Sequence, residues 1–323
     1  MLFLANFSNF GITNFKGELA ALSAAFLWAI TTVVWSRLGQ RIPPLELNLL
    51  KGAIALVFLA VTLFFQPQLL GEIDRTAIAL LLLSGIIGIA IADTAFFAAL
   101  NLLGPRRTLL LTTLTSPTVA LLALIFLQES LTINAWCGIL LTLLGVAWVI
   151  SERVTDVTGN TNHLFKGLGW AIVSILGDAV GAILSRAALT LTNITPLWST
   201  ILRLASGVLA LWLLLIIKNK IAIPSPNYLT NYDRNTRWQW QSLLSPKLFG
   251  IITLTAFAGT YLGIWLQQIS LTFTVAGIAK TLSATSPLFV LPIAAWMGEK
   301  ISLRSILGVL LALSGVILLF GLI

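Results

Sequence analysis

Long apolar runs, separated mostly by short polar segments, make up nearly the whole chain. A helix needs about 20 predominantly apolar residues to cross the roughly 30 Å of hydrocarbon in a bilayer. The pattern therefore predicts an all-α polytopic membrane protein with ten transmembrane helices, and the short connections favour antiparallel neighbours. We expect these helices at 17–36, 46–65, 77–100, 107–127, 132–150, 168–190, 197–217, 249–271, 274–297 and 303–323.

The fourth and ninth runs carry the same polar signature. Thr115-Ser116-Pro117 and Glu129 recur as Thr285-Ser286-Pro287 and Glu299, at one offset of 170 residues. Further matches keep the same order along the chain, which predicts an internal duplication of five helices. They are Lys16-Gly17 with Lys166-Gly167, Ser36-Arg37 with Ser185-Arg186, Pro44-Leu45 with Pro196-Leu197, Lys51 with Arg203, and Gly138 and Gly145 with Gly308 and Gly315.

An odd number of helices in each unit has a geometric consequence. The second copy must enter the bilayer from the opposite side, which gives the inverted repeat common in secondary transporters, with substrate held between the halves. We expect a tail at 1–16, a first repeat at 17–150, a linker at 151–166, and a second repeat at 167–323 that includes a loop at 218–248. The tail has no basic start or cleavage site, so it is not predicted to be a removed signal.

The composition supports a membrane protein and excludes several other classes. Hydrophobic residues make up 58% of the chain and charged residues 9%, against about 25% charged in soluble proteins. The net charge is +8, but the basic residues lie at the ends of apolar runs and form no stripe with interleaved aromatics, so no nucleic-acid partner is predicted. A single cysteine, Cys137, and a single histidine, His163, provide no metal-ligand cluster, and no phosphate-binding glycine loop is present. We therefore expect no metal and no cofactor.

The repeated helices resemble a known family. The prolines of the fourth and ninth runs, followed by "QESLTINAWCGILLTLLGV" and "GEKISLRSILGVLLALSGV", are similar to the EamA type of the drug/metabolite transporter superfamily. The resemblance covers roughly 17–323. It implies a ten-helix transporter of small organic molecules, often an exporter of amino acids or other metabolites, in the plasma membrane.

Two arguments about orientation disagree. The resemblance implies a cytoplasmic N-terminus, and the cytoplasmic loops would then carry only Lys16, Arg75 and Arg186. Most of the loop Lys and Arg residues would lie on the other side, and the positive-inside rule places the N-terminus outside. The sequence leaves the orientation open.

Five ionisable residues lie at membrane depth, where charge is costly and commonly functional. They are Asp93, Asp178, Lys51, Arg203 and Lys280. The aspartates have two interpretations. In the first, each is a proton or cation relay, because a carboxyl group can gain and lose a proton as its surroundings alternate between apolar and cationic. In the second, each forms a buried pair with Lys or Arg that only neutralises itself.

The three cations differ in their relation to the repeat. Lys51 and Arg203 are equivalent, which favours a shared structural role such as helix anchoring or snorkelling over substrate contact. Lys280 matches Leu110, so the symmetry of packing does not require its charge. Lys280 is therefore expected either to hold a substrate carboxylate or to pair with an aspartate.

Polar and aromatic residues extend the candidate binding site. Gln267 and Gln268 can hydrogen-bond a zwitterion, and Tyr261 and Trp265 can line an apolar pocket. The alternative is that the aromatic residues belong to interface belts or to helix packing. Trp28, mid-span in the first helix and matched by Asp178, is expected to face the interior.

The Ser-Pro pairs predict kinked or hinged helices. Proline removes an N–H, and a Ser or Thr hydroxyl can satisfy the freed carbonyl. Pro117 and Pro287 are therefore hinge candidates, with a static kink as the alternative. Glu129 and Glu299 are expected to be caps or interface charges. The glycines of the fifth and tenth helices are expected to pack helices, and could also support dimer contacts.

These features favour a secondary active transporter of small organic metabolites that works by alternating access, with proton coupling as one interpretation of the aspartates. An enzyme is not predicted, because no cluster of catalytic groups is evident. An intramembrane enzyme, a channel and a non-transporting receptor are the alternatives. The expected partners are the lipid bilayer and a small-molecule substrate, with the chain as a monomer or a homodimer.

Overall fold

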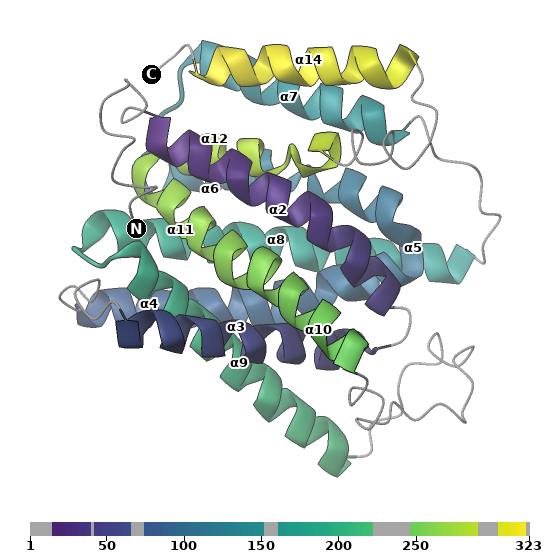
Figure 1. The fold of residues 1–323 in the computed structure, drawn as a ribbon. Helices are drawn as coiled ribbons and strands as arrows, with labels where there is room; N and C mark the ends of the chain where they lie inside the picture. The colour runs from purple at the N-terminus through teal and green to yellow at the C-terminus, as the bar shows by residue number, and fades with distance from the viewer. Residues whose placement is uncertain are drawn as a thin grey trace.

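The computed structural model describes residues 15–39, 42–65, 74–151, 161–221, 246–289 and 303–320. Within these ranges every regular element is a helix (Figure 1). The elements are α2 (Lys16–Gly39), α3 (Pro44–Phe65), α4 (Arg75–Gly85), η4 (Ile86–Asp93), α5 (Thr94–Thr112), α6 (Thr115–Phe126), α7 (Ile133–Ser151), α8 (Thr161–Leu191), α9 (Pro196–Ile221), α10 (Pro246–Thr255), η7 (Ala256–Leu262), α11 (Gly263–Phe273), α12 (Ala276–Ser283) and α14 (Leu303–Phe320).

Eight helical segments in the described part of the chain are long and apolar enough to cross a membrane. They coincide with the first eight predicted spans: Lys16–Gly39, Pro44–Phe65, Arg75–Gly104, Arg107–Phe126, Ile133–Ile150, Leu164–Leu191, Pro196–Lys218 and Pro246–Phe273. A shorter apolar helix, Ile306–Leu319, lies in the predicted tenth span. The ninth span is described only as far as residue 289, and Glu299 lies outside the described residues. The chain is thus an all-helical, multi-pass integral membrane protein.

The third and eighth spans each contain a π-helical stretch that the apolar pattern did not predict. The stretches are η4 and η7, which begin at Ile86 and Ala256, 170 residues apart. π-Helical turns are rare and are frequently found at functional sites. η4 packs against α8, where a Cβ added to Gly181 would lie 2.9 Å from the Cα of Gly88. η7 packs against α2, where Gly259 faces Thr31.

A turn interrupts both helices that carry a Ser-Pro pair, just before the pair. The turns lie at residues 113–114 and 284–285. The carbonyl freed by Pro117 belongs to Thr113, and it accepts the backbone N–H of Ser116 at 3.3 Å, not a side-chain hydroxyl as the sequence led us to expect. The Thr113 and Thr285 hydroxyls instead donate to the carbonyls of Leu110 and Leu282. Both helices are therefore broken, whereas hinge motion at Pro117 and Pro287 stays a prediction.

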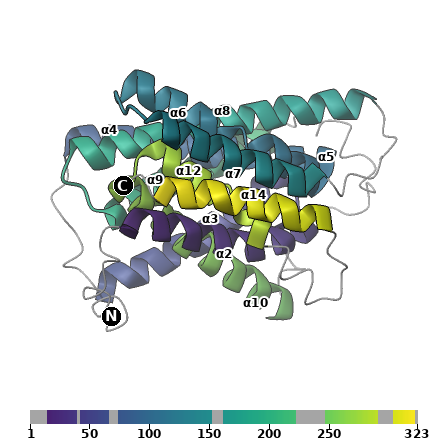
Figure 2. The same ribbon diagram turned by 90° about the horizontal axis from the view of Figure 1, so that it is seen from above.

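Helices α7 and α14 lie side by side at one edge of the bundle (Figure 1), nearest the viewer in Figure 2. The repeated glycines meet between them. A Cβ added to Gly145 would lie 2.6 Å from the Gly308 carbonyl oxygen, and a Cβ added to Gly315 would lie 2.7 Å from that of Gly138. The expected packing role therefore fits the structure. These glycine faces are occupied within the chain, so they are not free for dimer contacts.

Alanine in place of Gly145 is expected to lower the free energy of unfolding by about 1–3 kcal/mol, because the added methyl group would overlap the backbone of α14. Gly250→Ala is the matched control. A Cβ at Gly250 meets nothing within 4 Å, so that substitution is expected to be neutral or stabilising by about 0.4–1 kcal/mol. Thermal unfolding of both purified variants in detergent checks this. Equal melting temperatures would contradict the close packing of α7 on α14.

Candidate functional site

A cavity of about 250 Å³ lies among the helices. It is smaller than the roughly 300–1,000 Å³ sites that bind drug-sized ligands, which suits a small metabolite. All five ionisable residues that the sequence placed at membrane depth line it: Lys51, Asp93, Asp178, Arg203 and Lys280. Both broken helices also reach the cavity, through Ser116 and Pro287 among others. The cavity therefore collects charged groups from α3, η4, α8, α9 and α12.

Lys51 and Asp93 form one ion pair at the cavity wall. The Lys51 ammonium donates to the Asp93 carboxylate at 2.7 Å and also lies 4.9 Å from the centre of the Phe97 ring. Nearby, the amide of Asn48 donates to the Ile89 carbonyl at 2.8 Å and fixes α3 against η4. The Asp93 side chain stays 34% exposed, so its carboxylate faces the cavity while Lys51 is buried behind it.

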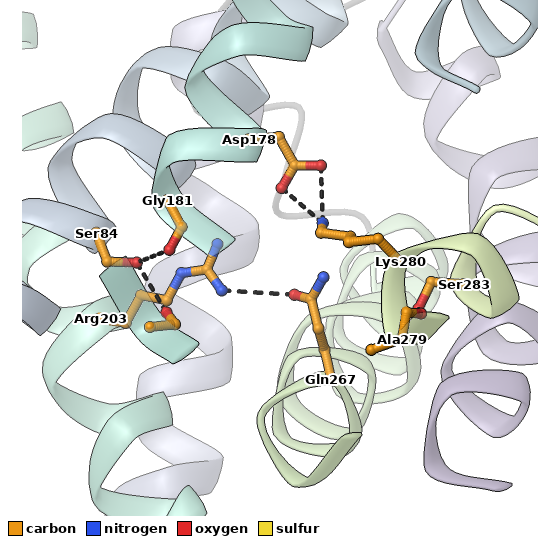
Figure 3. A network of polar contacts seen from close by, with 9 residues as sticks. Ser84, Asp178, Gly181, Arg203, Gln267, Ala279, Lys280 and Ser283 are labelled. Carbon is orange, nitrogen blue, oxygen red and sulfur yellow. Dashed lines mark hydrogen bonds and ion pairs between the residues drawn. The ribbon is translucent and has the colours of Figure 1, made fainter. Parts of the chain in front are cut away.

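Asp178 and Lys280 form a second pair, between α8 and α12 (Figure 3). The Lys280 ammonium donates to both carboxylate oxygens at 2.8 Å. Lys280 is buried, whereas the Asp178 side chain keeps 34% of its surface open. Lys280 was expected either to hold a substrate carboxylate or to pair with an aspartate, and in the structure it pairs with Asp178. Such a pair gains little stability from its own attraction, because burying both charges costs desolvation energy.

In the part of the chain that the structure describes, Arg203 has no carboxylate partner. It is 3% exposed, and Figure 3 shows its guanidinium pointing toward Gln267. Among the described residues, that guanidinium makes one hydrogen bond, from Nη1 to the Gln267 Oε1 at 3.5 Å, and its Nε is buried without a partner. The head groups of Arg203 and Lys51 both lie beside the cavity, so their geometry does not fit snorkelling to the membrane surface.

The remaining candidates divide into two groups. Trp28 and Gln267 line the cavity, and the Trp28 indole donates to the Gly259 carbonyl at 2.8 Å. Gln268 does not line it. Its buried side chain instead accepts a hydrogen bond from Ser199 at 2.8 Å. Adjacent helix positions point about 100° apart, which puts the two neighbouring glutamine side chains in different surroundings.

Tyr261 and Trp265 also lie away from the cavity lining. Their rings are 5.9 Å apart, and Tyr261 stacks on Phe257 at 5.2 Å. The Tyr261 hydroxyl shares a hydrogen bond with Thr62 at 2.7 Å, which joins η7 to α3. This arrangement is helix packing, the alternative that the sequence left open for the aromatic residues.

The sequence did not predict the ion pair between Arg186 and Glu129, which lies near the ends of α8 and α6. The Arg186 Nε donates to the Glu129 carboxylate at 2.6 Å, and its Nη1 donates to the carbonyls of Leu271 and Thr272. The other Glu129 oxygen accepts the Ala276 N–H at 3.0 Å, at the start of α12. Glu129 thus caps the start of α12, whereas a role as a charge at the membrane interface stays a prediction. Arg186 was visible in the sequence only as a marker of the repeat.

Comparison with known proteins identifies what the chain is similar to. The model of the EamA-like transporter family matches residues 15–151 and again 165–321. The uncharacterized transporter YyaM of Bacillus subtilis (strain 168) is 28% identical over 133 residues, 39% of this chain and 43% of YyaM. The match therefore spans less than half of that relative. A solved crystal structure superposes with a TM-score of 0.72 at 15% identity, over 96% of this chain and 98% of the other, which shows the fold alone.

Proposed function

Because the chain belongs to the EamA-like transporter family, we propose that this membrane transporter is a secondary active one, which moves a small organic metabolite by alternating access. The observation that carries the proposal is the cavity, because five charged side chains from separate helices converge on it. Charged groups at membrane depth commonly mark a substrate or ion pathway. Amino acids are the substrates proposed first, with export across the plasma membrane as the direction that the family resemblance implies.

The proposed architecture is ten helices in two inverted repeats, 17–150 and 167–323, joined by a linker at 151–166. Several structural equivalences support it beyond the sequence matches. The two π-helical stretches begin at equivalent positions, and the two repeated cations contact equivalent residues. Lys51 lies over Phe97, and Arg203 contacts Gln267, the residue equivalent to Phe97 in the second half.

Proton coupling is proposed for Asp178. Its carboxylate is open to the cavity and held by Lys280 alone among the described residues. Protonation would release Lys280, and Asp178 lies on α8 whereas Lys280 lies on α12. A proton can therefore change how two elements that line the cavity are held together.

Substrate counterflow in proteoliposomes tests the transport proposal. Purified protein is reconstituted, loaded with each unlabelled metabolite of a panel, and assayed for uptake of the same radiolabelled compound. We expect trans-stimulated uptake of at least one small metabolite, beginning with the amino acids. Protein-free liposomes give the background. No counterflow of any compound would contradict the proposal.

A pair of tryptophan substitutions tests whether the cavity is the route. Thr32 lines the cavity, so Thr32→Trp is expected to fill it and reduce counterflow to background. Ser314 is exposed on α14, so Ser314→Trp is the control that should keep wild-type rates. Size-exclusion profiles check that both variants fold. Wild-type counterflow in a monodisperse Thr32→Trp protein would show that substrate passes elsewhere.

A further inference from the structure

The charges of the described residues that line the cavity do not balance. Three are positive, on Lys51, Arg203 and Lys280, and two are negative, on Asp93 and Asp178. Each lysine has a carboxylate within 2.8 Å, so the two pairs account for four of the five charges. The surplus positive charge is therefore carried by Arg203.

The surroundings of Arg203 leave most of its hydrogen-bonding capacity unused. A guanidinium has five N–H donors, and here only Nη1 finds an acceptor among the described residues, at 3.5 Å. The Nε is buried without a partner. Asp178 and Asp93 attract Arg203 electrostatically, but neither lies within 4.0 Å of it. A buried cation in this state is costly unless something else supplies the counter-charge.

The comparison between the halves indicates why the counter-charge is missing. Lys51 is equivalent to Arg203 at an offset of 152 residues. The Asp93 that neutralises Lys51 is equivalent to Gly263 at an offset of 170 residues, the one that also relates η4 to η7. A Cβ at Gly263 would lie 2.6 Å from the Trp28 Nε1, so the indole occupies the space that a carboxylate side chain would need. The second half thus keeps the cation and has no room for its acid at this position.

A carboxylate has the chemistry to complete the site. The planar fork of a guanidinium binds a carboxylate through two parallel hydrogen bonds, with a geometry that an ammonium cannot match. The unpaired charge of Arg203 calls for one negative group beside it, which a single carboxylate supplies, whereas a dianionic phosphate would bring two negative charges. We propose that Arg203 is the residue that binds the substrate, and that the substrate is a small molecule with a single free carboxylate. That the bound carboxylate is a substrate rests on the proposed transport function. That Arg203 binds a carboxylate does not.

Binding is tested on the full chain in detergent, by ligand-induced shifts of the melting temperature. The probes are the common amino acids and short 2-oxo and 2-hydroxy acids, each beside its amide, together with inorganic phosphate. We expect at least one carboxylate to stabilise the wild type while its amide and phosphate do not. Arg203→Gln should weaken that binding about 10- to 100-fold, because a charge-assisted pair of hydrogen bonds is lost.

Two further variants separate the effect of the fork from the effects of charge and folding. Arg203→Lys keeps the charge and loses the fork, so its affinity should lie between those of the wild type and Arg203→Gln. This variant also keeps the test valid if the neutral variant does not fold. Lys218→Gln removes a cation that pairs with Glu46 and does not line the cavity, so its affinity should equal that of the wild type.

The outcomes distinguish this inference from the transport proposal. Carboxylate binding that Arg203→Gln or Arg203→Lys leaves unchanged would overturn the inference, as would equal binding of acid and amide, or no binding of any carboxylate to the wild type. Arg203-dependent binding of a carboxylate would support it even if the same compound showed no counterflow. In that case the transport proposal alone would fail.

Discussion

Asparagine in place of Asp178 is expected to abolish transport driven by a pH gradient while substrate exchange continues. Asparagine keeps the shape of the side chain but cannot take up a proton, and exchange needs no net proton movement. The measurement compares, in the same proteoliposomes, uptake driven by an imposed pH gradient with counterflow at equal pH. Equal loss of both activities in a folded protein would assign Asp178 to binding or structure instead of coupling.

The control for this prediction is the double variant Asp178→Asn, Lys280→Gln. The single substitution leaves the Lys280 ammonium buried without its counter-charge, and an uncompensated buried charge is itself destabilising. The double variant removes both charges and so should recover folding. We expect it to exchange substrate and to stay insensitive to the pH gradient. Gradient-driven uptake by the double variant would show that the proton is carried elsewhere.

Methionine in place of Arg186 is expected to lower the free energy of unfolding by about 3–5 kcal/mol, the usual cost of breaking a largely buried ion pair by removing one partner. The substitution leaves the Glu129 carboxylate uncompensated and also removes the donor to the Leu271 and Thr272 carbonyls. Methionine keeps much of the apolar length of arginine, so the loss reports mainly on charge and hydrogen bonds. Thermal unfolding of the purified protein in detergent measures it.

A double-substitution cycle shows how much of that loss belongs to the pair. In Arg186→Met, Glu129→Gln no charge is left unpaired, and the glutamine oxygen can still accept the Ala276 N–H. We expect the double variant to be more stable than Arg186→Met alone. If the losses of unfolding free energy measured for Arg186→Met and Glu129→Gln separately add up to that of the double variant, Glu129 and Arg186 do not stabilise each other.

The sequence identified the charged residues of the cavity well, because an ionisable group at membrane depth is conspicuous in an apolar run. It could not assign the partners of these residues. Lys51 finds Asp93, and Lys280 finds Asp178, through helix contacts between α3 and η4 and between α8 and α12. Those contacts depend on packing between distant segments, which a pattern along one helix does not contain.

The orientation of single side chains was the least predictable feature. Gln267 and Gln268 are neighbours of the same type, and nothing in their sequence says which faces the cavity. The π-helical stretch η7 ends at Leu262, five residues before Gln267. It adds to the difficulty because it changes the rotation of the helix that follows. Arg186 escaped notice for a different reason. It lies near the end of a long span, where a basic residue is ordinary.

The glycine contact between α7 and α14 limits where this molecule can change shape. At Gly145 and Gly308 the two backbones approach without intervening side chains, so sliding one helix past the other would bring larger neighbours into the same narrow space. None of the α7 and α14 residues whose side chains the structure describes belongs to the cavity lining. In the proposed alternating access, we therefore expect α7 and α14 to stay packed against each other, and the rearrangement that opens the cavity to either side to take place in the other helices.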